Sequence, residues 1–167
     1  RRIAAGVLTW GQDMDSETVP FQVNLGYQVP RDKRADYLGK EALETMRERI
    51  EAGDYPYSHT LVGILMGGKP VLDHAADFWL ISAVDDDVPC GYVTSPWYSP
   101  ELGSNIALAY VPVACSTPDT RLRVWLPGEY QEQANAPVAA MVVELPFGAP
   151  ESPDPRAEAK SPGRVLA

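Results

Sequence analysis

Two neighbouring aromatic residues, Trp97 and Tyr98, are the strongest candidates in this sequence for contact with a ligand. They lie between Pro96 and Pro100 in the stretch CGYVTSPWYSPELGSNIALAYV, residues 90–111. This pattern predicts a strand, a turn that holds both rings, and a second strand. An indole and a phenol each join an apolar surface to one polar group, so they suit either a ligand or a buried interface. We favour a proline-framed corner that plugs a barrel or packs on a neighbouring domain, with a position at the rim of a substrate site as the alternative.

The carboxylates and thiols of the chain offer little reactive chemistry. Asp13 and Asp15 resemble a carboxylate pair, but no neighbouring residue would tune either one as an acid. Polar residues after an apolar run usually cap and turn the chain, and we expect that role here. Cys90 has no neighbouring histidine or lysine to lower its pKa, so it is not predicted to be a nucleophile. The sequence therefore identifies no catalytic residue.

A metal site is not expected either. His59 and His74 stand far apart in the sequence, and no cysteine or carboxylate lies at ligand spacing from them. The acidic run of residues 85–87 lacks the long loop with a terminal glutamate that a calcium hand requires. We expect this run to form a solvated turn.

The composition is that of an acidic globular protein. The 167 residues carry a net charge of -9, whereas nucleic-acid binding needs clustered lysine and arginine, so no nucleic-acid partner is expected. No apolar run approaches the length of a membrane-spanning helix, so no membrane partner is expected. The chain opens at Arg1 in mid-pattern, without an initiator methionine or a signal-like region. We interpret it as a piece of a longer, cytoplasmic polypeptide.

The elements that would hold these residues are mainly β-strands. Six apolar or alternating runs, separated by turn residues, lie between residues 61 and 145. They predict an antiparallel barrel or a jelly-roll-like sandwich. In the fifth run, alternation places Leu122, Val124 and Leu126 on the side of the core.

The first third of the chain is less regular. An apolar, strand-like run ends at Trp10, and alternation predicts a further strand over residues 18–29. Residues 39–52 change to helical spacing and predict one short amphipathic helix, with Gly53 as its stop. From Pro150 onward the sequence is rich in proline and charge and predicts a flexible tail.

Several motifs occur in the order that they have in the glycine cleavage T-protein (aminomethyltransferase) family, which the chain resembles over residues 2–147. RIAAGVLTWGQDMD (2–15) is similar to the family's RLEAG…YG-D-D segment, and DYLGKEAL (36–43) is similar to its DFIGREAL helix start. GYVTS, YSP and NIALA resemble its barrel strands, and LPF (145–147) resembles its closing motif. By this resemblance the chain is similar to the C-terminal portion of the family.

The resemblance implies an organisation and an activity. Residues 1–57 would end a folate-binding α+β domain, residues 58–148 would form the C-terminal β-barrel domain, and residues 149–167 would be the tail. The implied activity is transfer of an aminomethyl or methyl group from a small donor to tetrahydrofolate, the expected cofactor. The family's catalytic aspartate precedes the part that resembles this chain. A missing N-terminal part of the same polypeptide is therefore the expected partner, and these residues alone are expected to be inactive.

The resemblance implies few ligand contacts within the chain. An aromatic at the position of Tyr27 lies beside folate in the family, so Tyr27 is the first candidate for a cofactor contact, with Trp97 and Tyr98 as further candidates. Ala4 replaces the family's usual glutamate, and Pro96 with Trp97 replaces a small residue. The ending of the chain looks more like branches that demethylate other donors, such as dimethylsulfoniopropionate demethylase and folate-dependent O-demethylases.

Two alternatives share the same motifs. One is a non-catalytic folate-binding protein of the same fold, and the other is the folate domain of a larger flavin-dependent amine dehydrogenase or oxidase. An upstream aspartate in the substrate-side loop would favour an enzyme. A dinucleotide-binding fingerprint before Arg1 would favour the flavoprotein.

Overall fold

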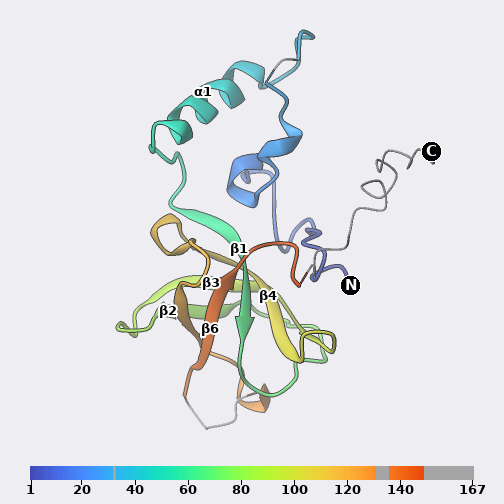
Figure 1. The fold of residues 1–167 in the computed structure, drawn as a ribbon, viewed down its shortest axis with the longest axis vertical. Helices are drawn as coiled ribbons and strands as arrows, with labels where there is room; N and C mark the ends of the chain where they lie inside the picture. Colours follow the sequence, from blue (N-terminus) through green and yellow to red (C-terminus); the bar gives the residue numbers. More distant parts are fainter. Residues whose placement is uncertain (32, 131–135, 149–167) are drawn as a thin grey trace, which may run out of the picture.

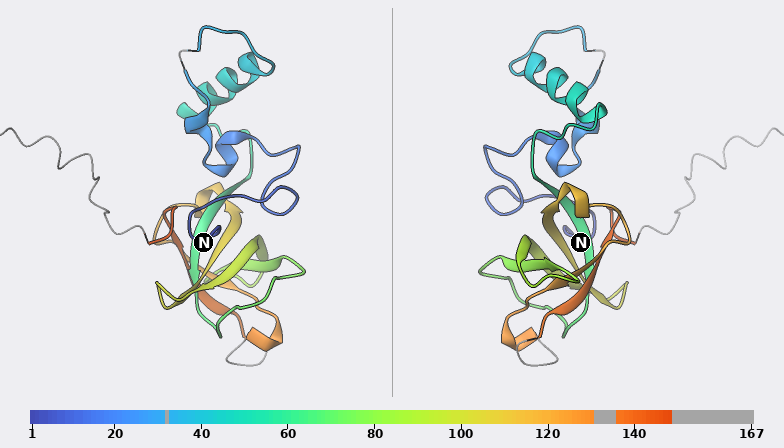
Figure 2. Two further views of the ribbon diagram at one scale, coloured as in Figure 1. Left: turned by 90° about the vertical axis from the view of Figure 1, so that its right-hand side faces the viewer. Right: turned by 90° about the vertical axis from the view of Figure 1, so that its left-hand side faces the viewer.

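The computed structural model describes residues 1–31, 33–130 and 136–148, and the tail expected from Pro150 onward lies outside them. A β-barrel forms one end of the elongated molecule, and helix α1 (Lys40–Glu51) stands at the other end (Figure 1). Between them lies an irregular N-terminal segment with two short 3-10 helices, η1 (Pro20–Val23) and η2 (Gly26–Gln28). Figure 2 shows the same arrangement from both sides.

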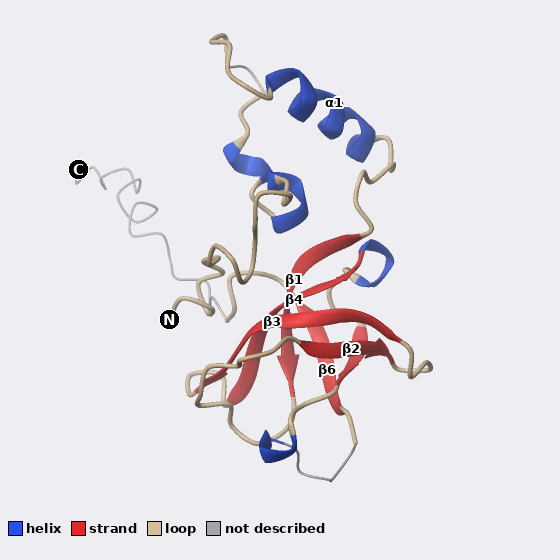
Figure 3. Cartoon of the chain, turned by 180° about the vertical axis from the view of Figure 1, so that it is seen from behind, coloured by secondary structure: helices blue, strands red, loops and turns tan. Residues whose placement is uncertain are grey.

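Six strands, each antiparallel to its neighbours, close into a barrel in the order β1-β4-β3-β2-β5-β6 (Figure 3). They are β1 (His59–Met66), β2 (Trp79–Ala83), β3 (Pro89–Ser99), β4 (Ser104–Pro112), β5 (Arg121–Val124) and β6 (Val138–Val143). The strands coincide with the six predicted runs. The prediction of a mainly β fold with one short helix and an antiparallel barrel is confirmed, and the closed barrel replaces the alternative of a sandwich.

Alternating side chains of the strands fill the interior of the barrel. Leu122 and Val124 of β5 are buried there together with Leu126, as the alternation predicted, whereas Arg121 is exposed. These residues join buried apolar side chains from all six strands in one cluster. The barrel thus has a packed core of its own, without an internal channel for a ligand.

A second apolar cluster lies outside the barrel, on the outer face of β1 and β4. Leu61 of β1 and Leu108 of β4 are buried there together with Val23 of η1 and Phe147 of the LPF motif. Gly63 of β1 leaves room for this packing, because a Cβ atom at this position would lie 3.0 Å from Cζ of Phe147. The N-terminal segment and the barrel therefore share a packed interface.

The strand predicted over residues 18–29 is wrong. Pro20 opens η1, where the fixed φ of proline suits a helical turn, and Asn24 ends it with a left-handed φ of 60°. Asparagine adopts this conformation more readily than most residues, so the chain turns here instead of extending. The apolar spacing reflects packing of Val23 on the barrel, with the backbone coiled in η1 and η2.

The strand-like run that ends at Trp10 is also irregular. Residues 2–6 form turns, and a single bridge joins Trp10 to Met14. Gly6 and Gly11 have φ values of 67° and 79°, a region that glycine occupies without steric cost. These two turns fold the first residues back against the barrel.

Helix α1 agrees closely with the predicted helix. Gly39 precedes it with a φ of 83°, and Gly53 follows it with a φ of 82°, as a C-terminal stop requires. Its apolar residues Leu43, Met46 and Ile50 are only partly covered, and no residue of the helix is buried. The helix therefore keeps an apolar side that the described part of the chain does not cover.

Candidate functional site

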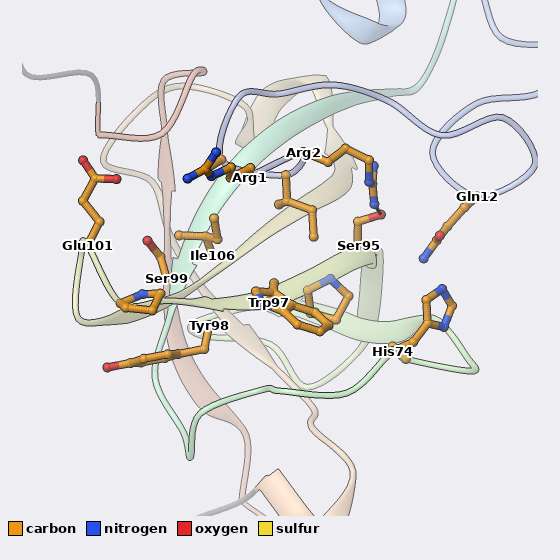
Figure 4. Close-up of a pocket in the computed structure, with 15 residues that line it drawn as sticks. Arg1, Arg2, Gln12, His74, Ser95, Trp97, Tyr98, Ser99, Glu101 and Ile106 are labelled. Carbon is orange, nitrogen blue, oxygen red and sulfur yellow. Dashed lines mark hydrogen bonds between the residues drawn. The ribbon is translucent and has the colours of Figure 1, made fainter. Parts of the chain in front are cut away.

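A cavity of about 410 Å³ lies between the first residues of the chain and the last part of β3 (Figure 4). Segments far apart in the sequence line it. The polar and aromatic side chains among them are Arg1, Arg2, Gln12, His74, Trp97 and Glu101.

A buried carboxylate fixes one wall of this cavity. Asp13 has no exposed side-chain surface, and its Oδ2 accepts hydrogen bonds from Nη1 of Arg2 at 2.7 Å and from the Thr9 backbone N–H at 2.8 Å. Its Oδ1 accepts from the hydroxyls of Thr94 and Ser95, each at 2.6 Å. A buried charge is tolerated only when it is paired and hydrogen-bonded, and Asp13 satisfies both conditions.

Two further hydrogen bonds attach the same turn to the barrel. Nε2 of Gln12 donates to the backbone carbonyl of Thr94 at 2.6 Å, and the Tyr110 hydroxyl donates to the backbone carbonyl of Asp13 at 2.7 Å. Burial raises the pKa of Tyr110 to about 12, so its phenol stays protonated and donates at neutral pH. The sequence predicted a local turn at Asp13, and the structure adds long-range contacts that the sequence did not reveal.

Asp15 behaves as predicted for a turn residue. Its carboxylate accepts hydrogen bonds from the backbone N–H groups of Glu17 and Thr18, at 2.9 and 3.1 Å. The hydrogen bond from Glu17 holds the pKa of Asp15 below its usual value. Asp13 and Asp15 therefore act separately and do not form a carboxylate pair.

The turn predicted at Trp97 and Tyr98 is wrong, because both residues belong to β3, which continues to Ser99. Pro96 is tolerated within this strand because β2 pairs with β3 only as far as Val93, so this part of β3 has a strand neighbour on one side only. Trp97 is 40% exposed, and its ring lies in the middle of the cavity (Figure 4). Tyr98 also lines the cavity, and its hydroxyl points away from Trp97.

Tyr27 lies elsewhere. It belongs to η2, its side chain is 80% exposed, and it does not line the cavity at Trp97. Its hydroxyl accepts a hydrogen bond from Nε2 of Gln28 at 3.1 Å. The structure thus brings Trp97 and Tyr98 together and separates them from Tyr27.

A second hollow, of about 610 Å³, lies between the 3-10 helices, α1 and β1. Gly26, the residue before Tyr27, lines it together with Phe21, Tyr55 and Tyr57. The rings of Tyr55 and Tyr57 meet edge to face with centroids 5.9 Å apart. Several aromatic side chains thus surround a hollow close to the exposed phenol of Tyr27.

The histidines and Cys90 have structural surroundings or stand alone. His59 contacts the Ser58 hydroxyl and the backbone carbonyl of Cys90, whereas His74 lines the cavity at Trp97. Burial raises the pKa of the Cys90 thiol, which disfavours the nucleophilic thiolate. Among the described residues, no group of three or more histidine, cysteine or acidic side chains could hold a metal ion.

The sequence did not reveal Arg1, Gln12, His74 and Glu101 as neighbours of Trp97. They come from two turns, a loop and the end of a strand, and no local spacing connects them. Only the packing of the first turns on β3 brings them together. In the part of the chain that the structure describes, no helix is long and apolar enough to cross a membrane.

The fold and its cavity define a closed antiparallel barrel domain with a preceding segment packed on its outer face. Residues 59–147 match the family model described as the glycine cleavage T-protein C-terminal barrel domain. This match covers more than half of the chain. The chain belongs to the glycine cleavage T-protein family, as its motifs predicted.

Several curated relatives are called aminomethyltransferases. Those of Synechococcus sp. (strain WH7803) and Thermotoga neapolitana are 34% and 35% identical over 146 residues, and a probable aminomethyltransferase of Natronomonas pharaonis is 36% identical over 149. Each alignment covers 87% of this chain and 35%, 34% and 36% of the relative. The chain thus spans about a third of the length of these relatives.

A solved structure shows the same fold. The crystal structure of glycine cleavage system aminomethyltransferase T from Bartonella henselae matches with a TM-score of 0.66 and 26% sequence identity. The match covers 87% of this chain and 36% of that one. The similarity therefore extends beyond the barrel to the N-terminal segment.

Proposed function

We propose that this chain is the C-terminal part of a tetrahydrofolate-dependent aminomethyl- or methyltransferase, which passes a one-carbon group from a small donor to tetrahydrofolate. Membership of the glycine cleavage T-protein family and the similarity to aminomethyltransferases support this proposal. Residues 1–57 end the folate-binding domain and residues 58–148 form the barrel domain in this proposal. The match of the family model to residues 59–147 supports the second boundary.

The observation that carries the proposal is the exposure of Tyr27. A phenol ring that is 80% exposed beside a hollow lined by Phe21, Tyr55 and Tyr57 has no partner of its own size among the described residues. Such a ring fits a planar heteroaromatic ligand, on which it can stack. Tyr27 is the proposed folate contact. Contact of Trp97 and Tyr98 with folate stays a prediction, since they line a different cavity.

The residues of this chain would act by position. When bound, tetrahydrofolate supplies the nitrogen atom that accepts the one-carbon group. Tyr27 would hold the flat ring system in place, and the barrel, whose core is closed, would exclude water from one side of the site. Alignment of two bound reactants alone accounts for ~7–11 kcal/mol of a barrier, so such a site does not require a reactive side chain within this chain.

Calorimetry with tetrahydrofolate tests the incompleteness of the site. The 167 residues alone should bind tetrahydrofolate with millimolar or weaker affinity, because they supply only one wall. Micromolar affinity of this chain alone would contradict the proposal. In the complete polypeptide, Tyr27→Ala should weaken tetrahydrofolate binding by roughly tenfold, whereas Tyr27→Phe, which keeps the ring, should change it little.

One observation favours a non-catalytic folate-binding protein as the second candidate. Ala4 stands where the family usually has a glutamate, and its methyl group packs against the apolar cluster outside the barrel, so no carboxylate is present there. A complete polypeptide that binds tetrahydrofolate but transfers no one-carbon group from any amine, sulfonium or methoxy donor would establish this alternative. Measured turnover with one such donor would exclude it.

A further inference from the structure

The cavity at Trp97 holds charged groups that have no partner. In the described part of the chain, Arg2, Arg49 and Arg123 each form an ion pair. Arg1 and Glu101 also line one cavity, yet neither side chain forms an ion pair or hydrogen bond with any described residue. Two opposite charges thus face the same space without neutralising each other.

An aromatic surface lies between these groups. Figure 4 shows Arg1 and Glu101 on the same side of the cavity and the ring of Trp97 in its middle. Trp97 is 40% exposed, and its indole N–H has no hydrogen-bond partner among the described residues. The face of an indole attracts a cationic nitrogen, and a carboxylate nearby adds to this attraction.

The wall behind these groups is rigid. Arg2 donates to Asp13 at 2.7 Å and to the Ser95 hydroxyl at 2.9 Å, and Gln12 is bound to the carbonyl of Thr94. A wall whose hydrogen bonds are already made does not have to be ordered when a ligand enters, which lowers the entropic cost of binding.

We propose that this cavity binds a small zwitterion. The cationic nitrogen of the ligand lies between the Glu101 carboxylate and the Trp97 ring, and its carboxylate lies on the Arg1 guanidinium. A simple anion would be repelled by Glu101 and by the net charge of -9, and a simple cation would be repelled by Arg1. A ligand with both charges satisfies both groups. This inference does not depend on the folate contact proposed for Tyr27, which lies outside the cavity.

Glycine betaine is a suitable probe, with tetramethylammonium and acetate as the two halves of its charge pattern. Titration of this chain, followed by NMR, should show saturable binding of glycine betaine, about tenfold tighter than binding of either half. Trp97→Leu and Glu101→Gln should each weaken it by roughly tenfold. The matched controls Phe78→Leu and Glu129→Gln, at exposed positions that do not line the cavity, should leave it unchanged.

Three results would overturn the proposal. The first is an absence of saturable binding, and the second is tetramethylammonium or acetate binding as tightly as glycine betaine. The third is displacement of glycine betaine by tetrahydrofolate, which would make this cavity a folate site and leave the proposed transferase function intact. Because Glu101 is exposed, Glu101→Gln should keep the fold even if Trp97→Leu does not, so the charge requirement remains testable.

Discussion

The Arg2 guanidinium lies 2.7 Å from the carboxylate of Asp13, which has no exposed surface. The same carboxylate accepts hydrogen bonds from Thr94 and Ser95 of β3. One side chain thus joins the first turn of the chain to a barrel strand that is more than eighty positions away along the chain.

Replacement of Asp13 by asparagine should therefore be strongly destabilising. Asp13→Asn removes the counter-charge of Arg2 and turns amide hydrogens toward groups that already donate, so the free energy of unfolding should fall by about 3–5 kcal/mol. Urea denaturation would measure this. The control is Asp15→Asn, which changes an exposed turn and should cost at most about 1 kcal/mol. Equal losses in the two variants would contradict the role of Asp13.

The stability of the fold should also fall at high pH because of Tyr110. Burial raises the pKa of this phenol to about 12 in the folded state, against about 10 in an unfolded chain. The folded protein therefore keeps a proton that the unfolded chain loses. The stabilisation is present below about pH 10 and is lost as the pH rises from about 10 to about 12.

Urea denaturation at about pH 9 and about pH 11 would measure this loss. Tyr110→Phe should reduce the pH dependence and, at neutral pH, should cost about 1–2 kcal/mol, because the carbonyl of Asp13 loses its donor. The pKa values of Tyr57 and Tyr92 are also raised by burial, so some pH dependence should remain. Tyr55→Phe, at an exposed position, should leave the slope unchanged. An identical slope in Tyr110→Phe and the parent chain would be the contradicting outcome.

Two glycines offer a matched test of the barrel packing. A Cβ atom at Gly91 of β3 would overlap the backbone oxygen of Tyr110 in β4, so Gly91→Ala must push two paired strands apart. We expect a loss of about 2 kcal/mol or more in the free energy of unfolding. Gly128 has no neighbouring atom within 4 Å of such a Cβ, so Gly128→Ala should be nearly neutral. Thermal unfolding of both variants would decide, and a tolerated Gly91→Ala would show that this contact is not tight.

The apolar cluster outside the barrel should contribute as much as a core does. Phe147 is 7% exposed and packs with the cluster that includes Val23 and Leu61. Phe147→Ala should lower the free energy of unfolding by about 3–5 kcal/mol. The exposed Phe78 provides the control, since Phe78→Ala should cost much less. Comparable losses would mean that the cluster adds little to stability.

The barrel was predictable from the sequence because alternation is a local signal. In β5, Arg121 and Leu122 point to opposite sides, and their residue types record this directly. Helix α1 was predictable for the same reason, with Gly53 as its stop. The motifs that resemble the glycine cleavage T-protein family added the family assignment, which the match of residues 59–147 confirms.

The N-terminal segment and the cavity were not predictable in this way. In η1, alternating apolar residues imitated a strand, although Pro20 and Asn24 set a different backbone. At Trp97, two prolines indicated a turn, but β3 has a free side there and accommodates Pro96. The cavity depends on contacts between residues distant in the sequence, for which no spacing rule exists.

The packing of the N-terminal segment on β1 and β4 has a practical consequence for anyone who trims this polypeptide. The limits of the family model, residues 59–147, would cut away Val23 and its neighbours. Leu61 and Leu108 would then face water on the outside of an otherwise intact barrel. An excised barrel of that length should self-associate, and useful truncations must begin upstream of the two 3-10 helices.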